Sequence, residues 1–227
     1  MNSEGTPTPM VTLTYYTELI SSWCFWAEPA WAQLKEAYAD SVKFQWKLAL
    51  MDQSGLPVSR AQCEWFYRRS GTLVRSPEML NSGWYEPELK EYLAPNLVAE
   101  AGKDFGISDD RIRLALVRAA LVDGKRVGQW PVAVQIGAEA AGIDFQALLE
   151  RAQSEAVLLR ARASTAEFHA MKATQRPTFL IESSIGDRVM LSGLATAEPI
   201  AVAIDAMLVD VKGYRSFAAH FGGPPSI

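Results

Sequence analysis

One stretch near the N-terminus decides the fold: Val11-Thr-Leu-Thr-Tyr-Tyr-Thr-Glu18-Leu-Ile-Ser21-Ser22-Trp23-Cys24-Phe25-Trp26. Apolar and polar residues alternate from Val11 to Thr17, which is typical of a β-strand with two different faces. Ser21 and Ser22 are good N-cap residues for a helix that follows. Free backbone N–H groups and the positive end of the helix dipole favour an anion, such as a thiolate, at this junction.

Composition narrows the class of protein. The chain has 227 residues, of which 49% are hydrophobic and 21% charged, as expected for a globular protein with a sizeable core. The net charge of -4 and the lack of a basic stripe argue against nucleic-acid binding. The sequence has no apolar run long enough to span a bilayer and no secretory signal, so we expect a cytoplasmic protein without a membrane anchor.

The two cysteines, Cys24 and Cys63, form neither a disulfide framework nor a metal-binding spacing, and we expect no metal. Cys24 fits a small buried packing residue better than a reactive thiol. A Cys24–Cys63 disulfide is conceivable, but sequence alone cannot bring the two residues together.

The order of elements predicts an α/β fold. A second strand spans residues 42–50, and an irregular connection with short helical pieces follows to about residue 86. Helical patterns then occupy residues 87–93, 108–121, 132–141, 145–152 and 154–173. A strand from Arg176, a hairpin strand at 189–191 and a helix from Thr196 or Ala197 to Leu208 complete the pattern.

We therefore predict a βαβ unit and a ββα unit that share one four-stranded sheet, interrupted by an all-helical insertion. The boundaries are residues 10–75 for the N-terminal half and its connection, 76–173 for the insertion, 174–211 for the C-terminal half and 212–227 for a loosely attached Gly/Pro-rich tail.

From about Val11 to Leu208, this layout resembles the thioredoxin fold of the DsbA family, which carries such an insertion. The segment from Glu18 to Phe25 looks like the family's acidic residue, two apolar residues, Cys-Pro-Trp-Cys and an aromatic residue. Arg176-Pro177-Thr178-Phe179 looks like the cis-proline turn that faces the active site. The insertion is similar to that of the FrnE-like, 2-hydroxychromene-2-carboxylate isomerase and kappa-class glutathione transferase branches.

One departure from the family bears on function. Ser21 takes the place of the first, nucleophilic cysteine, and Cys24 takes the second, resolving position, so the motif cannot close its own disulfide. A serine hydroxyl is a poor nucleophile without a neighbouring base. The isomerase and kappa branches also have serine here, where the hydroxyl is thought to bond the sulfur of glutathione and favour its thiolate. The resemblance thus implies Ser21 and Cys24 as the catalytic positions.

The resemblance also implies a binding site for glutathione or a similar peptide-like thiol. Ser22 and Trp23 lie at the helix start, and the backbone before Pro177 can pair with an extended ligand. Arg176 is either a cation beside that ligand or an exposed strand-end arginine. Thr196 corresponds to the region that binds the γ-glutamyl end, and Trp65, Tyr67, Trp84 and Tyr85 are candidates for an aromatic wall.

Three functions stay open. The first is a thiol-dependent isomerase or transferase that acts on a small, aromatic electrophile; the second is a thiol-disulfide oxidoreductase that uses Cys24; the third is a binding protein without catalysis. A homodimer is compatible with the resemblance, because relatives often dimerise.

Glu18 is either a buried acidic residue that tunes the thiol, as in relatives, or a strand-end charge. Arg111, Arg113 and Arg118 are expected on a solvated helix face.

Overall fold

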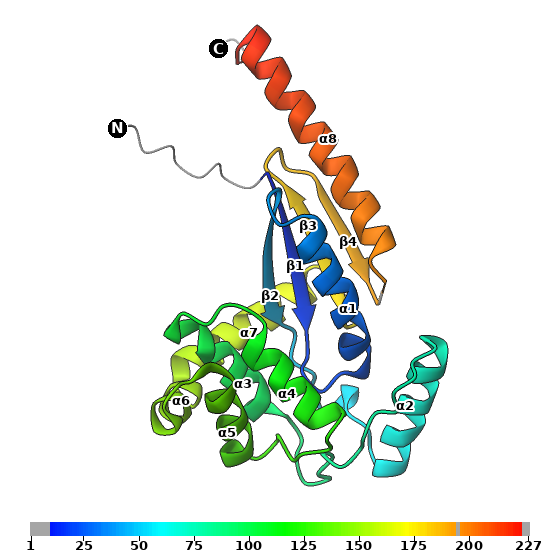
Figure 1. Ribbon diagram of the computed structural model, residues 1–227, viewed down its shortest axis with the longest axis vertical. Helices are drawn as coiled ribbons and strands as arrows, with labels where there is room; N and C mark the ends of the chain where they lie inside the picture. Colours follow the sequence, from blue (N-terminus) through cyan, green and yellow to red (C-terminus); the bar gives the residue numbers. More distant parts are fainter. Residues whose placement is uncertain (1–9, 194–195, 224–227) are drawn as a thin grey trace.

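The computed structural model describes residues 10–193 and 196–223, and it contains a four-stranded sheet in the order β2-β1-β3-β4 (Figure 1). Strands β1 (Val11–Thr17) and β2 (Val42–Leu48) are parallel. Strand β3 (Thr178–Ser183) is antiparallel to β1, and β4 (Arg188–Ser192) is antiparallel to β3. The predicted sheet, built from both ends of the chain, is confirmed.

Helices cover both faces of the sheet, so its central strands are buried on both sides. Leu13 and Tyr15 pack into the main core with α1 (Ser22–Ala37) and α8 (Glu198–Phe221). Tyr16 points to the opposite face and packs against Phe168 of α7 (Glu155–Ala170). No helix within the described residues is both long and apolar enough to cross a bilayer.

The insertion forms a helical body beside one end of the sheet (Figure 1). Its central helix, α3, is buried along almost its whole length, and the others pack around it. Asp144 caps one of them by accepting a hydrogen bond from the Ala147 N–H, as the sequence predicts. The body comprises α3 (Leu93–Gly102), the 3-10 turn η2 (Lys103–Phe105), α4 (Arg111–Leu121), α5 (Trp130–Ala141) and α6 (Phe145–Ala152).

Two local predictions between β2 and α3 are wrong. After the short turn η1 (Gln53–Gly55), the chain forms a regular helix, α2 (Arg60–Leu73), instead of short helical pieces. Ser59 caps α2, while Cys63 and Tyr67, four residues apart, are among the side chains that bury one face. Residues 87–92 form no helix, and the Tyr92 hydroxyl accepts a hydrogen bond from the Glu86 N–H across this segment.

The prediction of a loose tail from residue 212 is also wrong for the residues that the structure describes. Helix α8 continues without interruption to Phe221, because the only helix-weakening residue on the way is Gly213, and a single glycine is tolerated. Gly222, with φ of +78°, ends the helix. Residues 224–227 lie outside the described part of the chain.

Arg113 contradicts the prediction of a solvated arginine face. Its side chain is fully buried and donates to both carboxylate oxygens of Glu28 on α1, and to Asp110 at 2.9 Å. The Tyr15 hydroxyl donates to the same Glu28 carboxylate at 3.1 Å. Arg111 and Arg118 are exposed as expected. The buried cation therefore joins the insertion to the first helix of the thioredoxin part.

Replacing Arg113 by alanine should destabilise the protein by about 3–5 kcal/mol, because it leaves the Glu28 and Asp110 carboxylates without their buried cation. Arg111→Ala is the matched control on the same helix, since Arg111 pairs with the exposed Asp109 among the described residues, and it should leave the midpoint nearly unchanged. Urea unfolding followed by circular dichroism measures both effects. Equal midpoints for the two variants would contradict the structural role of Arg113.

Candidate functional site

Two segments that lie about 150 residues apart in the sequence line one cavity of about 250 Å³. Ser21, Ser22 and Trp23 come from the start of α1, and Arg176 comes from the loop before β3. The Arg176–Pro177 peptide bond is cis, and Pro177 is buried. The predicted meeting of helix start and proline turn is therefore present. The rest of the lining is Ile20, Met51, Gly55, Pro57, Cys63, Phe66, Tyr67, Arg69, Trp84, Thr174 and Gln175.

Ser21 is the N-cap of α1 and faces this cavity. Its Oγ accepts a hydrogen bond from the Cys24 N–H at 3.4 Å, and its carbonyl accepts from the Phe25 N–H at 3.0 Å. Because Oγ serves the cap as an acceptor, its proton is available for donation to a ligand or to the neighbouring Cys24 sulfur. The first turn of a helix also leaves backbone N–H groups without intrahelical acceptors. The junction therefore presents hydrogen-bond donors and a positive helix end.

Cys24 is the buried packing residue that the sequence favours. Its side chain is 2% exposed, and Sγ accepts from the Glu18 N–H at 3.5 Å. Burial raises the pKa of the Cys24 thiol, although the Glu18 N–H and the Ser21 hydroxyl partly oppose this effect. Cys63 is also buried, and burial raises its pKa to about 11. Both thiols are free, so the conceivable Cys24–Cys63 disulfide is absent.

Glu18 is buried, which decides between the two interpretations of this residue. One carboxylate oxygen accepts from the side-chain amide of Asn96 on α3, and the other accepts from the Met51 N–H at 2.9 Å. The Asn96 carbonyl oxygen in turn accepts from the Leu19 N–H at 3.3 Å. Burial raises the pKa of Glu18. The carboxyl group thus connects the end of β1, the exit from β2 and the helical insertion.

Neither of the two predicted roles of Arg176, a cation beside the ligand or an exposed strand-end arginine, fully describes its position. Its guanidinium donates to the carbonyls of Ala49 and, at 2.8 Å, Leu50, and it lies 4.7 Å from the centre of the Phe168 ring. The side chain is half-buried rather than an exposed strand end. Burial lowers its pKa, and the Glu18 carboxyl partly compensates. Arg176 therefore builds the cavity wall and also brings positive charge to it.

Only two of the four residues predicted for the aromatic wall line this cavity. Tyr67 and Trp84 line the cavity, and the Trp84 indole N–H donates to the Tyr67 hydroxyl at 2.5 Å. Trp65 is 53% exposed and lies outside the lining, as does the buried Tyr85. Cys63 and Phe66 were not predicted as lining residues. Their spacing with Tyr67 on α2 is the signal that could have identified them.

Thr196 does not join the other predicted ligand residues. It lies on a second and larger cavity of about 830 Å³, bounded by α1, α4 and the segment that follows α2. Phe25 and Trp26 of α1, with Leu114 and Val117 of α4, give this cavity a largely apolar wall. The start of α1 therefore presents Ser21 and Ser22 to the first cavity and, one turn later, Phe25 and Trp26 to the second.

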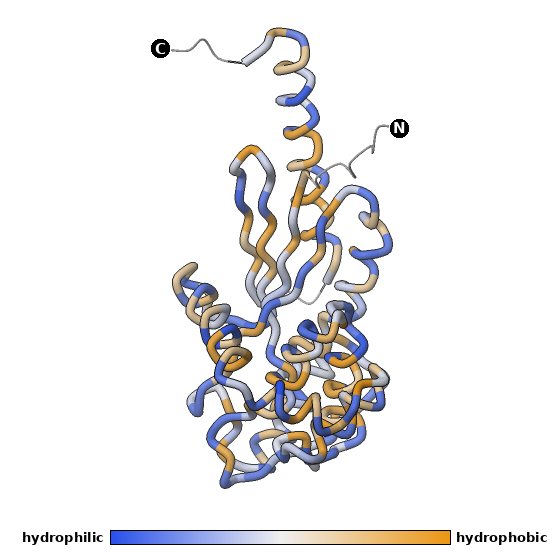
Figure 2. Tube along the Cα trace, turned by 90° about the vertical axis from the view of Figure 1, so that its left-hand side faces the viewer, coloured by the Kyte–Doolittle hydropathy of each residue, from blue (hydrophilic) through white to orange (hydrophobic). Residues whose placement is uncertain are grey.

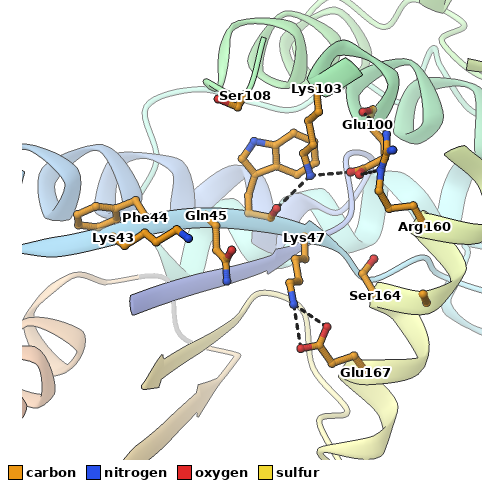
Figure 3. Close-up of a pocket in the computed structure, with 12 residues that line it drawn as sticks. Lys43, Phe44, Gln45, Lys47, Glu100, Lys103, Ser108, Arg160, Ser164 and Glu167 are labelled. Carbon is orange, nitrogen blue, oxygen red and sulfur yellow. Dashed lines mark hydrogen bonds and ion pairs between the residues drawn. The ribbon is translucent and has the colours of Figure 1, made fainter. Parts of the chain in front are cut away.

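A third cavity, of about 560 Å³, follows the outer edge of β2, and most of its charged groups, though not Lys43, pair with one another (Figure 3). Lys47 binds Glu167 at 2.7 Å, and Lys103 binds Glu100 at 2.7 Å. Lys103 also donates to the Trp46 carbonyl at 3.2 Å, which occupies an acceptor on the strand edge. These contacts protect the edge strand β2 and leave few unpaired charged groups for catalysis.

Solved structures match the described architecture, whereas no protein-family model and no curated protein matches the sequence. The cytosolic disulfide reductase DsbM from Pseudomonas aeruginosa superposes with a TM-score of 0.67 at 19% identity, over 91% of this chain and 100% of that chain. The chain has the DsbA-like thioredoxin fold.

Two further structures agree with this assignment. The structure of DsbM with GSH gives a TM-score of 0.65 at 18% identity, and covers 90% of this chain and 99% of that chain. The 2-hydroxychromene-2-carboxylate isomerase structure gives 0.57 at 14% identity, with 91% and 98% coverage. These likenesses confirm the predicted DsbA-like fold, in which a helical insertion interrupts the thioredoxin sheet.

The burial of both thiols leads to a simple prediction about reactivity. In the native protein at neutral pH, Cys24 and Cys63 should react with an aromatic disulfide reagent at least about a hundredfold more slowly than in denaturant, because a raised pKa and burial both suppress thiolate attack. Absorbance of the released thiol measures the rate, and denaturant should expose two thiols per chain. Rapid native modification that disappears in Cys24→Ala would contradict this account.

Proposed function

We propose that the chain binds glutathione or a similar peptide-like thiol in the cavity of about 250 Å³ and uses that thiol in an isomerase or transferase reaction. The observation that carries the proposal is the position of the Ser21 hydroxyl and the Arg176–Pro177 loop on the same cavity. The Ser21 segment supplies a hydrogen-bond donor for the sulfur. The Arg176–Pro177 segment supplies backbone groups that can pair with a peptide-like ligand.

The proposed role of Ser21 is to stabilise the thiolate of the ligand. A hydrogen bond to a charged group contributes about 1.5–3 kcal/mol, and the helix N-terminus adds about 0.3–1 kcal/mol. Together these effects lower the pKa of a bound thiol by roughly 1–3 units. Because an ordinary thiol has a pKa of about 8.5, a shift of this size makes the thiolate a major species near neutral pH. The half-buried charge of Arg176 acts in the same direction.

The backbone of Arg176 supports binding of an extended ligand. In the part of the chain that the structure describes, its N–H and carbonyl take part in no backbone hydrogen bond, since the β3 ladder begins only at Thr178. An extended γ-glutamyl-cysteinyl segment that pairs with these groups would bring its sulfur toward the start of α1. The proposed ligand is therefore held by its main chain at one wall and by its sulfur at the other.

The proposed second substrate is a small aromatic electrophile in the cavity of about 830 Å³. Phe25 and Trp26 provide an aromatic surface there, and Leu114 and Val117 of the insertion provide the opposite apolar wall. Pockets of this size and character bury most of a small ligand. In this proposal, the start of α1, which lines both cavities, brings a thiolate in one toward a substrate in the other.

Oxidoreductase chemistry by the protein's own thiols is the weaker candidate. Cys24 is buried, and the thiol partner at position 21 is replaced by a hydroxyl.

We propose a cytoplasmic setting, which the free thiols and the fold shared with a cytosolic reductase support.

The test of the proposal is the ultraviolet absorbance of the thiolate when glutathione is added at millimolar concentration and neutral pH. The wild-type protein should bind glutathione and raise this absorbance, and Ser21→Ala should reduce the increase roughly fivefold or more, because the sulfur loses its donor. A protein that binds no glutathione, or a signal that persists in Ser21→Ala, would contradict the proposal.

Ser154→Ala is the matched control. Ser154 caps α7 by accepting from the Val157 N–H at 3.4 Å, the same distance as in the Ser21 cap. Both variants should lose about 1 kcal/mol of stability from the missing cap. Only Ser21→Ala should lose the thiolate signal, which separates ligand chemistry from helix capping.

A further inference from the structure

The cavity of about 560 Å³ beside β2 carries a surplus of positive charge. Four cationic side chains line it, whereas only two carboxylates do. These side chains are Lys43, Lys47, Lys103 and Arg160 against Glu100 and Glu167. The whole chain has a net charge of -4, so the cavity is opposite in sign to the protein around it. A hollow lined mainly by charge of one sign concentrates ions of the other sign.

The cations reach this hollow from three different elements (Figure 3). Lys43 and Lys47 belong to β2, and Figure 2 shows hydrophilic and hydrophobic residues mixed along the strands. Lys103 begins η2, and Arg160 lies in α7. The side chains of Lys47, Lys103 and Arg160 are only 26–38% exposed. The fold itself therefore gathers these charges, which are not a scatter of surface lysines.

The ion pairs within the cavity do not cancel the surplus. Glu167 pairs with Lys47 at 2.7 Å. Glu100 is shared by two cations, Lys103 at 2.7 Å and Arg160 at 2.6 Å. One carboxylate that serves two cations compensates only one of them.

The neighbouring Asp104 does not supply the missing negative charge. It pairs with Arg160 at 3.1 Å but also with Arg151 at 2.5 Å, so it is matched by a cation of its own. Lys43 forms no ion pair within residues 10–193 and 196–223. Burial lowers the pKa of Lys103, and the charges of Arg160 and Lys47 lower it further, although Glu100 opposes them. The cations repel one another, and an anion between them would relieve that repulsion.

Trp46 adds a hydrogen-bond donor that lacks an acceptor. It lines the same cavity and is 4% exposed. Its indole Nε1 is buried without a partner within the described residues, although buried donors nearly always have one. The Lys103 Nζ lies 3.6 Å from the centre of the Trp46 ring and covers it. An anion that draws Lys103 toward itself would uncover this donor.

The set of donors favours phosphate oxygens over carboxylate oxygens. Three of the four cations are lysines, whose ammonium groups bind phosphate as point charges, whereas carboxylates are matched best by the arginine fork. The Ser108 hydroxyl also lines the cavity and has no hydrogen-bond partner within the described residues. Phe44 and Trp46 provide aromatic surface, and a volume of about 560 Å³ accommodates a small molecule rather than a lone ion.

We propose that this cavity binds a small phosphorylated molecule, with its phosphate groups among Lys43, Lys47 and Lys103 and its organic part against Phe44 and Trp46. The site lies at the outer edge of β2, and it shares no lining residue with the cavity of about 250 Å³ at Ser21. The proposal does not depend on the proposed function.

Isothermal titration calorimetry of the full chain with inorganic pyrophosphate tests the binding. Lys43→Glu should weaken binding at least about tenfold, because it replaces an attractive charge by a repulsive one without breaking an ion pair. Lys212→Glu is the matched control, since it makes the same charge reversal at an exposed position on α8 and should leave the affinity unchanged. No binding by the wild type, or equal affinities of the two variants, would overturn the proposal.

Citrate distinguishes phosphate from carboxylate chemistry in the same experiment. It carries a similar charge on carboxylate groups, and we expect it to bind at least about fivefold more weakly than pyrophosphate. Equal or tighter binding of citrate would overturn the assignment to phosphorylated molecules.

The indole N–H signals in a two-dimensional ¹⁵N NMR spectrum test the location. The chain has seven tryptophans, and the signal that Trp46→Phe removes belongs to Trp46. Pyrophosphate should shift this signal and leave those of Trp23 and Trp84, which line the other cavity, in place. Shifts of Trp23 or Trp84 without a shift of Trp46 would place the anion in the cavity at Ser21 and overturn the proposal.

Discussion

The site depends on how the short backbone segment after β2 is held from two sides. The Glu18 carboxylate accepts from the Met51 N–H, and the Arg176 guanidinium donates to the carbonyls of Ala49 and Leu50. Glu18 belongs to the end of β1, and Arg176 belongs to the loop before β3. Asn96 of the insertion binds the same carboxylate. This buried network fixes the distance between the helix start and the proline loop, and hence the cavity between them.

Ser21 and Cys24, three residues apart at the start of α1, lie in different environments. Burial keeps Cys24 protonated and out of reach, while Ser21 at the cavity wall keeps a donor proton. The chain therefore lacks an exposed thiol of its own at this position but retains the electrostatic setting that favours a thiolate. The proposed ligand brings its own sulfur to this site.

Local patterns predicted much of the fold and part of the site. Strand alternation, the Ser21 cap and the Arg176–Pro177 segment are encoded within a few residues, so sequence was sufficient for them. Arg113 was misassigned because only tertiary packing brings Glu28 and Asp110 to it. The positions of Thr196 and Trp65 likewise depend on how distant helices pack. The extension of α8 was missed because Gly213 looked like the start of a tail, although one glycine does not end a helix.

The most direct test of the central claim is a glutathione titration followed by two-dimensional amide NMR of the ¹⁵N-labelled protein. The account predicts shifts that saturate at millimolar glutathione and cluster on Ser21, Ser22 and Trp23 together with Gln175 and Arg176, which line one cavity although they are far apart in sequence. Shifts confined to one of these two segments, shifts at another surface, or no shifts at all would contradict the account.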